Sequence, residues 1–322
     1  MSSEVQATSI DAVVSKESSC SRGYFKDPFL PFFVPERDRR RRSPLINRGY
    51  YARFRAFDLV LRRFDAAFPD PAQRQVVSLG GGSETIWFRL KLENRQPKTY
   101  LEFDLGPITQ GKAKAVLGNV EMSSLLGKQH PIPAESHTVL DTDEYKIITC
   151  DLTDTELFAK LLGKHLDLSL PTLFISECVL VYVDPTASAK VLSTISSKFP
   201  VSFVVSYEQI NPHDAFGKQM VRNLHSRGCA LLGLEAHPDL ASQEARFQRN
   251  GFPFVKAIDM KQVYYDVLAK RDRARVEQLE IFDEFEEFFL IMQHYALTMG
   301  STVNTAVGMN LDPEIEGELS IH

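Results

Sequence analysis

Residues 76–85 read VVSLGGGSET, and the expected fold follows from this stretch. The apolar run Val76–Leu79 passes directly into Gly80, Gly81 and Gly82, a pattern typical of a strand that turns tightly into a helix. Glycines let the backbone approach a ligand closely, and the free amides of the following helix can face that ligand. The stretch predicts either a ligand-binding turn or a purely structural connection between strand and helix.

Strand-like and helix-like segments alternate after this turn. The β-rich runs lie at residues 100–103, 146–149, 173–176 and 202–205, with a shorter one near 255–258. Helix-compatible segments lie at 154–165, 185–199, 214–227 and 240–250, and an acidic amphipathic stretch lies at 281–295. Such alternation predicts βαβ units, and therefore an α/β fold with a mostly parallel sheet and helices on both faces.

The residues before the first strand predict an added helical layer. Aromatics and prolines alternate between residues 24 and 44, and residues 49–68 have the spacing of an amphipathic helix. We expect a single domain over residues 21–300, with a helical cap at 21–74 and the α/β core at 75–300. The polar segments 1–20 and 301–322 show no period, so we expect a flexible N-terminus and a disordered tail.

The composition restricts the classes of function. Of the 322 residues, 43% are hydrophobic and 25% are charged, as in ordinary soluble globular proteins. The 37 Lys and Arg against 42 Asp and Glu give a formal charge of −5, which does not favour broad binding to nucleic acid. No window approaches the roughly 18 apolar residues of a membrane span, and the polar N-terminus lacks the apolar core of a signal peptide. We expect a cytoplasmic protein.

The cysteines and histidines show no metal or disulfide pattern. The four cysteines lie far apart without a CxxC pair, which predicts reduced thiols. None of the eight histidines has metal-ligand spacing at a strand end, so no metal site is expected. The basic run Arg39–Arg42 is interpreted either as a solvated charge cluster or as a surface that steers an acidic partner.

Acidic residues follow three of the predicted strands. Asp104 follows Gly82 by 22 residues, near the roughly 20-residue spacing of a carboxylate that binds ribose hydroxyls. Asp151 and Glu177 follow the next two strands, although Asp151 has the alternative role of a helix cap. Because the carboxyl ends of parallel strands meet at one edge of a sheet, these acids and the glycine turn predict a nucleoside site.

The details of the turn favour S-adenosylmethionine over a nicotinamide cofactor. Thr85 stands where the last glycine of a GxGxxG motif would be. The acids after the third and fourth strands can satisfy an adenine amine and an ammonium group, whereas a pyrophosphate would be poorly served by carboxylates.

Four motifs resemble the leucine carboxyl methyltransferase family. They are NRGYYAR at 47–53, VSLGGG at 77–82, SECVLVY at 176–182 and SYEQ at 206–209, and the resemblance extends from about residue 24 to residue 295. It implies a Rossmann-like methyltransferase with S-adenosyl-L-methionine as its cofactor. It also implies methylation of the C-terminal leucine α-carboxylate of the type 2A protein phosphatase catalytic subunit, by a monomer that binds neither nucleic acid nor membrane.

The resemblance also implies the residues of the cofactor site. The expected set is Lys16, Arg53, Gly80, Asp104, Asp151, Leu152 and Glu177. Gly80 would line the methionine part, Asp104 would bind the ribose, and Glu177 would face the polar end of the cofactor. Asp151 would bind the adenine amine, with Leu152 beside the ring. Lys16 aligns with a family lysine near the site, but the sequence around it diverges from the family. The alternative is that Lys16 is a surface residue with no role in the site.

Three residues are expected to act on the substrate: Arg53, Tyr182 and Tyr207. The planar fork of Arg53 can bind a carboxylate bidentately, with a solvated helix arginine as the alternative. Tyr182 and Tyr207 follow the fourth and fifth strands. The phenol of each could face the transferred methyl group or the peptide carboxylate; the alternative for each is a ring packed in the core. Cys178 is expected to be a small buried residue rather than a nucleophile, because no motif pairs it with a histidine.

Two other functions are compatible with these motifs. A tRNA wybutosine-type carboxyl methyltransferase is similar over the catalytic domain, but those relatives resemble fusions with a β-propeller, and this sequence shows no repeat of about 40–50 residues. A non-catalytic phosphatase-binding module would fail to bind the cofactor despite an intact fold, whereas the expected cofactor residues are all present here.

Overall fold

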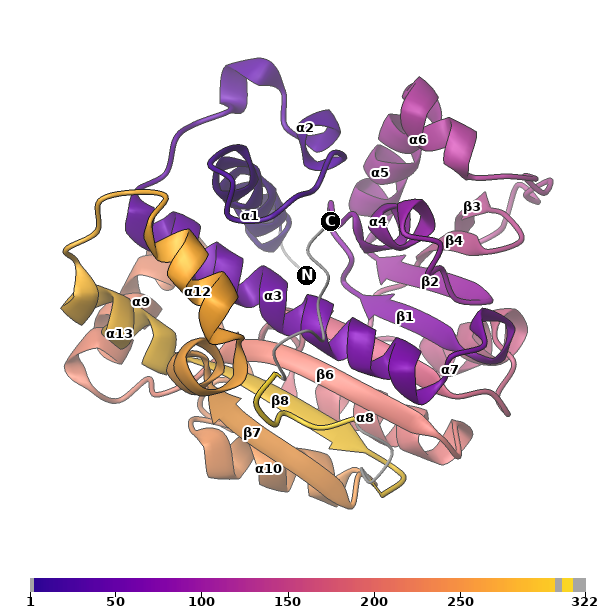
Figure 1. Ribbon diagram of the computed structural model, residues 1–322. Helices are drawn as coiled ribbons and strands as arrows, with labels where there is room; N and C mark the ends of the chain where they lie inside the picture. The colour runs from indigo at the N-terminus through magenta and orange to yellow at the C-terminus, as the bar shows by residue number, and fades with distance from the viewer. Residues whose placement is uncertain (1–2, 305–308, 315–322) are drawn as a thin grey trace.

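The computed structural model describes residues 3–304 and 309–314, and its centre is an eight-stranded sheet in the order β3-β4-β2-β1-β5-β6-β8-β7 (Figure 1). The strands are β1 (Gln75–Leu79), β2 (Thr99–Asp104), β3 (Thr138–Asp141), β4 (Tyr145–Thr149), β5 (Thr172–Glu177), β6 (Ser202–Gln209), β7 (Phe254–Asp259) and β8 (Tyr295–Ser301). The neighbours β4, β2, β1, β5 and β6 are parallel, whereas the pairs β3–β4, β6–β8 and β8–β7 are antiparallel. The predicted mostly parallel sheet is confirmed.

Helices cover both faces of this sheet. They are α1 (Ser3–Ser21), α2 (Leu30–Phe33), α3 (Pro44–Ala67), α4 (Ile86–Leu92), α5 (Gly106–Gly118), α6 (Val120–Leu125), α7 (Thr155–His165), α8 (Pro185–Lys198), α9 (Ala215–Ser226), α10 (Leu240–Arg249), α11 (Met260–Gln262), α12 (Lys270–Glu277) and α13 (Phe285–Gln293). Within the described ranges, no helix combines the length and the hydropathy that a bilayer span requires.

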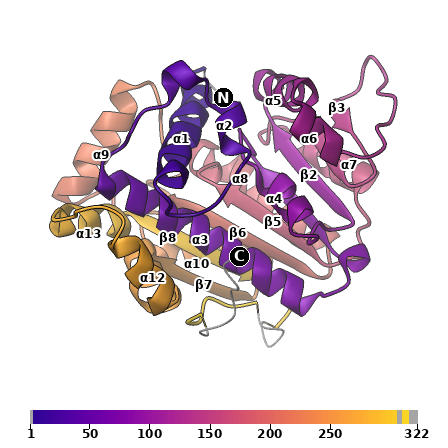
Figure 2. The same cartoon turned by 45° about the horizontal axis from the view of Figure 1, so that its top comes forward.

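Two apolar clusters hold the layers together. On one face, α1, α3, α4, α5 and α13 bury side chains such as Phe64 and Trp87, and α3 runs across the sheet in both views (Figures 1 and 2). On the other face, α7, α8 and α10 bury Phe158, Val191 and Phe247. Because both faces are covered, strands such as β1, β5 and β6 are buried along nearly their whole length and show no alternation of buried and exposed residues.

Local signals begin several of these helices. The Asp154 side chain accepts a hydrogen bond from the backbone N–H of Leu157 at 3.0 Å, which caps α7. Asp184 accepts from the Thr186 N–H at 2.9 Å and is followed by Pro185 at the first position of α8. These predicted helices are therefore specified largely by residues close to them in sequence.

The N-terminal segment differs from the expectation of a flexible stretch over residues 1–20. Residues 3–21 form helix α1, which lies against α3. The Ser18 hydroxyl donates to the Asn47 side-chain oxygen at 2.9 Å, and the Ser19 hydroxyl donates to the Asn47 carbonyl at 2.8 Å. Because buried serines make much of this contact, α1 shows only a weak apolar periodicity, and the sequence pattern could not reveal it.

Strand β8 was also not predicted. The sequence shows an acidic amphipathic stretch over 281–295 and predicts a tail from residue 301, yet Tyr295–Ser301 forms a strand inserted between β6 and β7. Helix α13 stops at Gln293. A short apolar run that is buried on both sides has no alternation to distinguish it from an adjoining helix, which is why it escaped prediction.

Part of the expected C-terminal tail is packed rather than disordered. Met309 is fully buried and Leu311 is nearly so. The Arg55 Nη2 atom donates to both carboxylate oxygens of Glu314 at 3.1 and 3.2 Å, and the Arg63 Nη1 atom donates to the Asn310 carbonyl at 2.8 Å. These contacts bind residues 309–314 to α3. The rest of the expected tail, residues 305–308 and 315–322, lies outside the described residues.

Substitution of Met309 by alanine is expected to lower the free energy of unfolding by about 2–5 kcal/mol, because it removes a fully buried side chain and leaves a cavity. Urea denaturation of the parent and the variant measures this difference. The exposed Asp312→Ala is the matched control and should change the value by less than about 0.5 kcal/mol. An unchanged unfolding free energy for Met309→Ala would show that residues 309–314 do not contribute to the fold.

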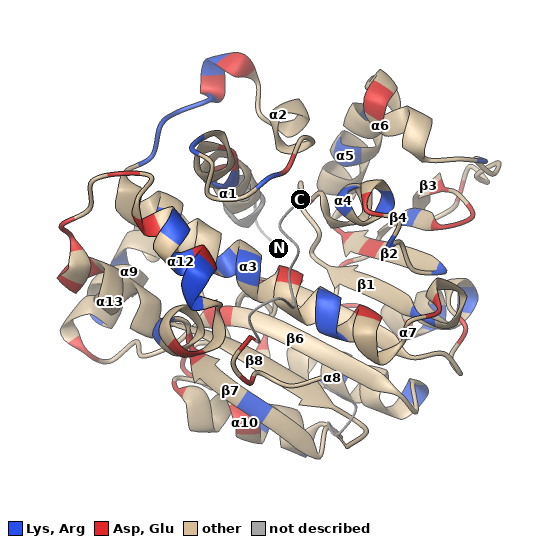
Figure 3. Ribbon diagram, in the orientation of Figure 1, with Lys and Arg blue, Asp and Glu red and all other residues tan. Residues whose placement is uncertain are grey.

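The basic run before α3 is the blue segment between α2 and α3 in Figure 3, and it pairs with residues of other segments. The Arg42 Nη2 atom lies 2.8 Å from the Asp11 carboxylate of α1, and the Arg41 Nη2 atom lies 3.0 Å from that of Glu280. Arg39 donates to the Pro31 carbonyl at 3.0 Å. The run therefore links α1, the α2 segment and the loop before α13.

Candidate active site

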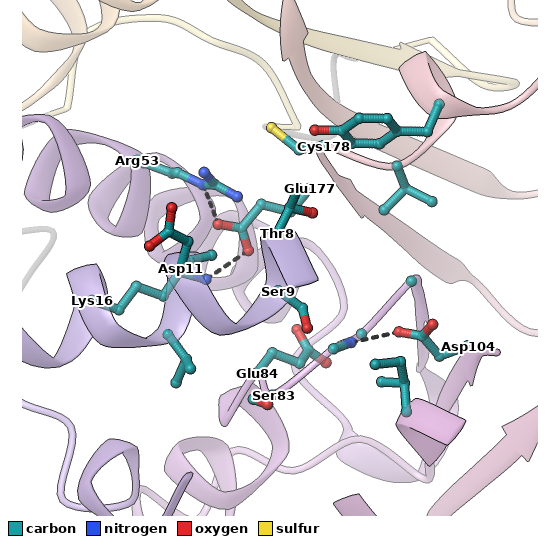
Figure 4. A pocket seen from close by; sticks show the side chains of 18 of the residues that line it. Thr8, Ser9, Asp11, Lys16, Arg53, Ser83, Glu84, Asp104, Glu177 and Cys178 are labelled. Carbon is teal, nitrogen blue, oxygen red and sulfur yellow. Dashed lines mark hydrogen bonds and ion pairs between the residues drawn. The ribbon is translucent and has the colours of Figure 1, made fainter. Parts of the chain in front are cut away.

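A cavity of about 280 Å³ opens at the carboxyl ends of β1, β2 and β5 (Figure 4). Helices α1 and α3 supply one wall, which includes Lys16 and Arg53. The loops after the three strands supply a second wall, and Gln209 of β6 and Tyr295 of β8 complete it. Its volume approaches that of a small-molecule pocket, and it lies at the sheet edge where ligands of parallel α/β folds bind.

The glycine turn after β1 must lack side chains to form this cavity. Gly80 has a positive φ of 67°, and a Cβ atom added there would lie 2.5 Å from the Val179 Cγ2 atom. A Cβ on Gly81 would lie 3.0 Å from the Glu102 Oε2 atom. The turn is therefore held between the loop after β5 and a buried carboxyl beneath it, and only glycine fits at residue 80 without movement.

Asp104 at the end of β2 is fixed by backbone amides. Its Oδ2 atom accepts from the Gly82 N–H and its Oδ1 atom from the Leu105 N–H, each at 2.7 Å (Figure 4). Burial raises the pKa of this carboxyl, and the two amides oppose that effect. Each carboxylate oxygen can accept a second hydrogen bond, and Asp104 is among the residues that line the cavity.

Glu177 at the end of β5 joins two cations from the helical cap. The Arg53 Nε atom donates to its Oε1 atom, and the Lys16 Nζ atom donates to its Oε2 atom at 2.8 Å (Figure 4). Burial acts to raise the pKa of Glu177, but the two cations more than offset it and lower the pKa to about 2. Two cations share one carboxylate, which leaves this group of three with a net positive charge at neutral pH.

Two aromatic rings lie near the Arg53 guanidinium. Its guanidinium carbon lies 4.7 Å from the centre of the Tyr207 ring and 5.4 Å from that of Tyr50. Burial lowers the pKa of Arg53, but the Glu177 carboxylate offsets this and the net pKa is raised, so Arg53 stays charged. Of the three guanidinium nitrogens, only Nε donates a hydrogen bond to another described residue. The N–H groups of Nη1 and Nη2 can therefore donate to an anion.

The two predicted tyrosines have different positions. Tyr182 lines the cavity, whereas Tyr207 is not among its lining residues and stacks on Tyr295 with ring centres 5.0 Å apart. Tyr207 therefore lies behind the site, where its ring positions Arg53. Burial raises the pKa of both phenols, so each is neutral at pH 7.

An apolar corner lies beside Tyr182. Cys178 and Leu224 of α9 line the cavity with it, and the same side chains belong to a small apolar cluster under α9. Burial raises the pKa of the Cys178 thiol to about 11, so the thiol is protonated at neutral pH and a poor nucleophile.

Asp151 and Leu152 are at the same sheet edge but outside the lining of this cavity. They follow β4, which pairs with β2, and the Cys150 N–H donates to the Asp104 carbonyl at 2.8 Å. The Asp151 side chain accepts from the Thr153 N–H at 2.9 Å. Both residues therefore follow the strand that pairs with the strand ending in Asp104.

Several lining residues were missed by sequence reasoning. Tyr295 lies on the unpredicted strand β8, and Gln209 is the last residue of the SYEQ motif, to which no role was given. Asp11 of α1 pairs with Arg42 and, at 3.4 Å, with the Nη1 atom of Arg227. Only the SYEQ motif could have directed attention to one of these residues.

A buried polar cluster supports the glycine turn from below. The Lys112 Nζ atom lies 2.5 Å from the Glu102 Oε2 atom, and the Tyr145 hydroxyl donates to the Glu102 Oε1 atom at 2.7 Å. Burial raises the pKa of Glu102 to about 7, against the effect of Lys112. Glu84, which lines the cavity, accepts from the Tyr100 hydroxyl at 2.6 Å.

Comparison with known proteins shows the family to which this chain is similar. The family model described as leucine carboxyl methyltransferase matches residues 4–196. A leucine carboxyl methyltransferase 1 homolog of Arabidopsis thaliana is 40% identical, over 95% of this chain and 90% of its own length. The human tRNA wybutosine-synthesizing protein 4 is 36% identical over 94% of this chain, which spans only 44% of that protein.

A solved structure shares the fold at low sequence identity. The DUF574 family protein of Streptomyces avermitilis superimposes with a TM-score of 0.50 and 14% identity, over 81% of this chain and 86% of that one. At this identity the likeness concerns the fold alone.

Proposed function

The chain belongs to the leucine carboxyl methyltransferase family, and on this premise we propose that it methylates the C-terminal leucine α-carboxylate of the type 2A protein phosphatase catalytic subunit. The methyl donor in this proposal is S-adenosyl-L-methionine. One observation carries the proposal: Arg53 and Asp104 line the same cavity. Arg53 is a charged guanidinium with N–H donors left for a carboxylate, and Asp104 is a strand-end carboxylate of the kind that binds ribose hydroxyls.

The residues at the sheet edge fit this cofactor. Asp104 can accept both ribose hydroxyls, and the backbone of Gly80 allows close approach of the methionine part. Lys16 and Glu177 carry the charges that complement an amino acid end with one carboxylate and one ammonium. Asp151 and Leu152, after the next strand, would hold the adenine amine and ring. When bound, the cofactor supplies an electrophilic methyl group on a sulfonium.

The substrate carboxylate needs orientation rather than a base. A terminal α-carboxyl group has a pKa of about 3.5, so it is already ionised at neutral pH. The Nη donors of Arg53 would hold one carboxylate oxygen and leave the other free to attack the methyl group in line. Alignment and removal of water are the main contributions of such a site, and proximity alone can supply up to roughly 7–11 kcal/mol of the barrier.

The apolar corner would accept the leucyl side chain. Cys178, Tyr182 and Leu224 offer a protonated thiol, a ring and a branched aliphatic group, with no charge among them. A branched C4 side chain gains from burial there, whereas a charged side chain would lose hydration without a partner.

Transfer of a radiolabelled methyl group tests the proposal. The substrates are the intact phosphatase catalytic subunit, the same subunit without its terminal leucine, and bulk tRNA, because one relative is a tRNA-modifying protein. We expect label in the intact subunit alone. Label in tRNA or in the truncated subunit would overturn the proposed substrate, and the absence of saturable heat on titration with S-adenosylmethionine would indicate a non-catalytic module.

A C-terminal amide is expected to abolish methyl transfer. The amide lacks the anionic oxygen that attacks, and its N–H group would face Arg53, which can only donate. The measurement compares a phosphatase catalytic subunit ending in leucine with one ending in leucinamide, at the same concentration. Methylation of the amidated subunit would place the acceptor atom elsewhere.

The rate constant kcat is expected to stay level between about pH 6 and pH 8. The substrate carboxylate and Glu177, with a pKa of about 2, are ionised throughout this range, and Arg53 remains protonated. No histidine is among the described residues that line the cavity. Initial rates at saturating substrate, measured across the range, check the expectation.

A steep acidic limb near pH 6.5 would instead indicate a general base. Glu102→Gln is the control variant. Burial raises the pKa of the Glu102 carboxyl to about 7, so its titration beneath the glycine turn could by itself change kcat in this pH range. A limb that persists in this variant, and is not caused by slow product release, would contradict the mechanism.

A further inference from the structure

A cation lies at the outer edge of the cavity. Arg227, the residue that follows α9, is among the lining residues, and its side chain is 67% exposed. Its Nη1 atom donates to the Asp11 carboxylate at 3.4 Å, so the end of α9 meets α1 here (Figure 2). Because Arg227 both lines the cavity and is largely exposed, it marks a place where the cavity opens to solvent.

The charges at this opening are not balanced. Asp11 also pairs with the Arg42 Nη2 atom at 2.8 Å, which is the shorter of the two contacts. Two cations therefore share one carboxylate, and the three side chains together carry a net charge of +1. An exposed pair such as Asp11–Arg227 contributes little to stability. The guanidinium has five N–H donors and this contact uses one, so Arg227 can bind a further anion.

Helix α9 places Arg227 next to the apolar corner proposed for the leucyl side chain. Leu224 forms part of that corner, and Arg227 follows it by three residues. The backbone of Arg227, with φ −92° and ψ 8°, stays near the helical region, so the two side chains lie on one face with Cβ atoms roughly 5–6 Å apart. A peptide whose last side chain enters the corner therefore passes Arg227 on its way out of the cavity.

The spacing of an extended peptide matches this arrangement. Successive residues advance by about 3.3 Å and their side chains alternate in direction, so the third side chain from the end points the same way as the last, about 6.6 Å from it. This distance is close to one helical turn of about 5.4 Å. A carboxylate at that position would gain a charge-assisted hydrogen bond from Arg227, whereas an ammonium group would be repelled.

We propose that Arg227 binds an acidic side chain at the third residue from the C-terminus of the substrate, and so makes the protein prefer acidic tails. This inference rests on the proposed function, since it adds a contact to the same substrate. Arg227 is then a specificity-determining residue at the entrance, separate from Arg53, which faces the terminal carboxylate.

The test varies one residue of the substrate tail. Phosphatase catalytic subunits are prepared by ligation of synthetic tails that end in leucine and carry Asp, Asn or Lys at the third residue from the end. The parent protein should prefer the Asp tail over the Asn tail by about three- to fivefold in kcat/KM, and over the Lys tail by about tenfold. The effect should be mainly on KM, because the contact is already made in the bound substrate. Salt at about 0.5 M should reduce the preference, because it screens exposed charges.

Substitutions at residue 227 test the assignment of this contact. Arg227→Gln should show no preference for the Asp tail over the Asn tail, and Arg227→Glu should favour the Lys tail. Arg222→Gln is the matched control, because Arg222 is exposed on the same helix but does not line the cavity; it should keep the full preference. Titration calorimetry with S-adenosylmethionine should give the parent affinity for Arg227→Gln, which shows that the fold and the cofactor site are intact.

Asp11→Asn separates substrate binding from support of α1. If Arg227 served only to hold α1 through Asp11, this variant and Arg227→Gln would break the same contact and have the same effect. If Arg227 binds the substrate, Asp11→Asn removes a competing carboxylate and should increase the preference for the Asp tail. An equal loss of preference in the two variants would overturn the inference.

Two other results would also contradict it. Equal kcat/KM for the three tails with the parent protein at low salt would exclude a contact between Arg227 and the third residue. A preference that survives in Arg227→Gln would assign the acidic side chain to another cation. If the parent protein labels none of the three subunits, the proposed function itself fails, and this inference fails with it.

Discussion

Replacement of Asp104 by alanine is expected to weaken S-adenosylmethionine binding by more than tenfold. The side chain is half-buried at the end of β2, and its two oxygens are oriented by the N–H groups of Gly82 and Leu105. Each charge-assisted hydrogen bond to a ribose hydroxyl should contribute about 1.5–3 kcal/mol, so the loss of both gives a large effect. Titration calorimetry measures the dissociation constant of the variant against that of the parent.

A second substitution separates ribose binding from support of the glycine turn. Asp104→Asn retains one acceptor oxygen for a backbone amide but replaces the other by a donor. We expect it to unfold close to the parent temperature and still to bind the cofactor weakly. If Asp104→Ala bound S-adenosylmethionine as tightly as the parent, Asp104 would not be part of the cofactor site. The main argument for where the ribose binds would then be lost.

Replacement of Arg53 by lysine is expected to lower kcat/KM for methyl transfer by about a hundredfold or more. Lysine keeps the positive charge but loses the planar fork, so it cannot pair with Glu177 and a substrate carboxylate in the same geometry. Removal of one partner from a buried charge pair generally costs about 2–5 kcal/mol. Steady-state kinetics with the intact phosphatase catalytic subunit gives the ratio.

Cofactor binding distinguishes a substrate role of Arg53 from a structural one. Lys16 still neutralises Glu177 in this variant, so the affinity for S-adenosylmethionine should fall much less than kcat/KM. Arg249→Lys, exposed on α10, is the control and should behave as the parent. If Arg53→Lys keeps full kcat/KM, the carboxylate of the substrate is held by another group.

The parallel core could be predicted because its signals are local. Each of its central strands is an apolar run of a few residues, followed by a turn and a capped helix such as α7 or α8. The amphipathic spacing of residues 49–68 likewise predicted the helical layer that precedes it. By contrast, α1 buries serine hydroxyls against Asn47 of α3, and such contacts have no periodic signature in the sequence.

The candidate site was predictable in part for the same reason. Gly80, Asp104 and Glu177 each follow a parallel strand, and the topology of such a sheet brings those positions to one edge. Lys16 and Arg53 join them only because α1 and α3 fold over that edge. The contact of Glu177 with both cations therefore depends on packing between segments more than a hundred residues apart.

The amino-acid order alone was sufficient for the class of fold, the glycine turn and the strand-end acids, because the conformation of each strand, turn and helix follows from short-range patterns. The tertiary structure was needed for the arrangement around the substrate. Strand β8 pairs with β6 across the chain and sets Tyr295 opposite Gln209, and both residues line the cavity. Pairing between distant segments is a property of the folded chain, since no local sequence pattern encodes which strand an apolar run will join.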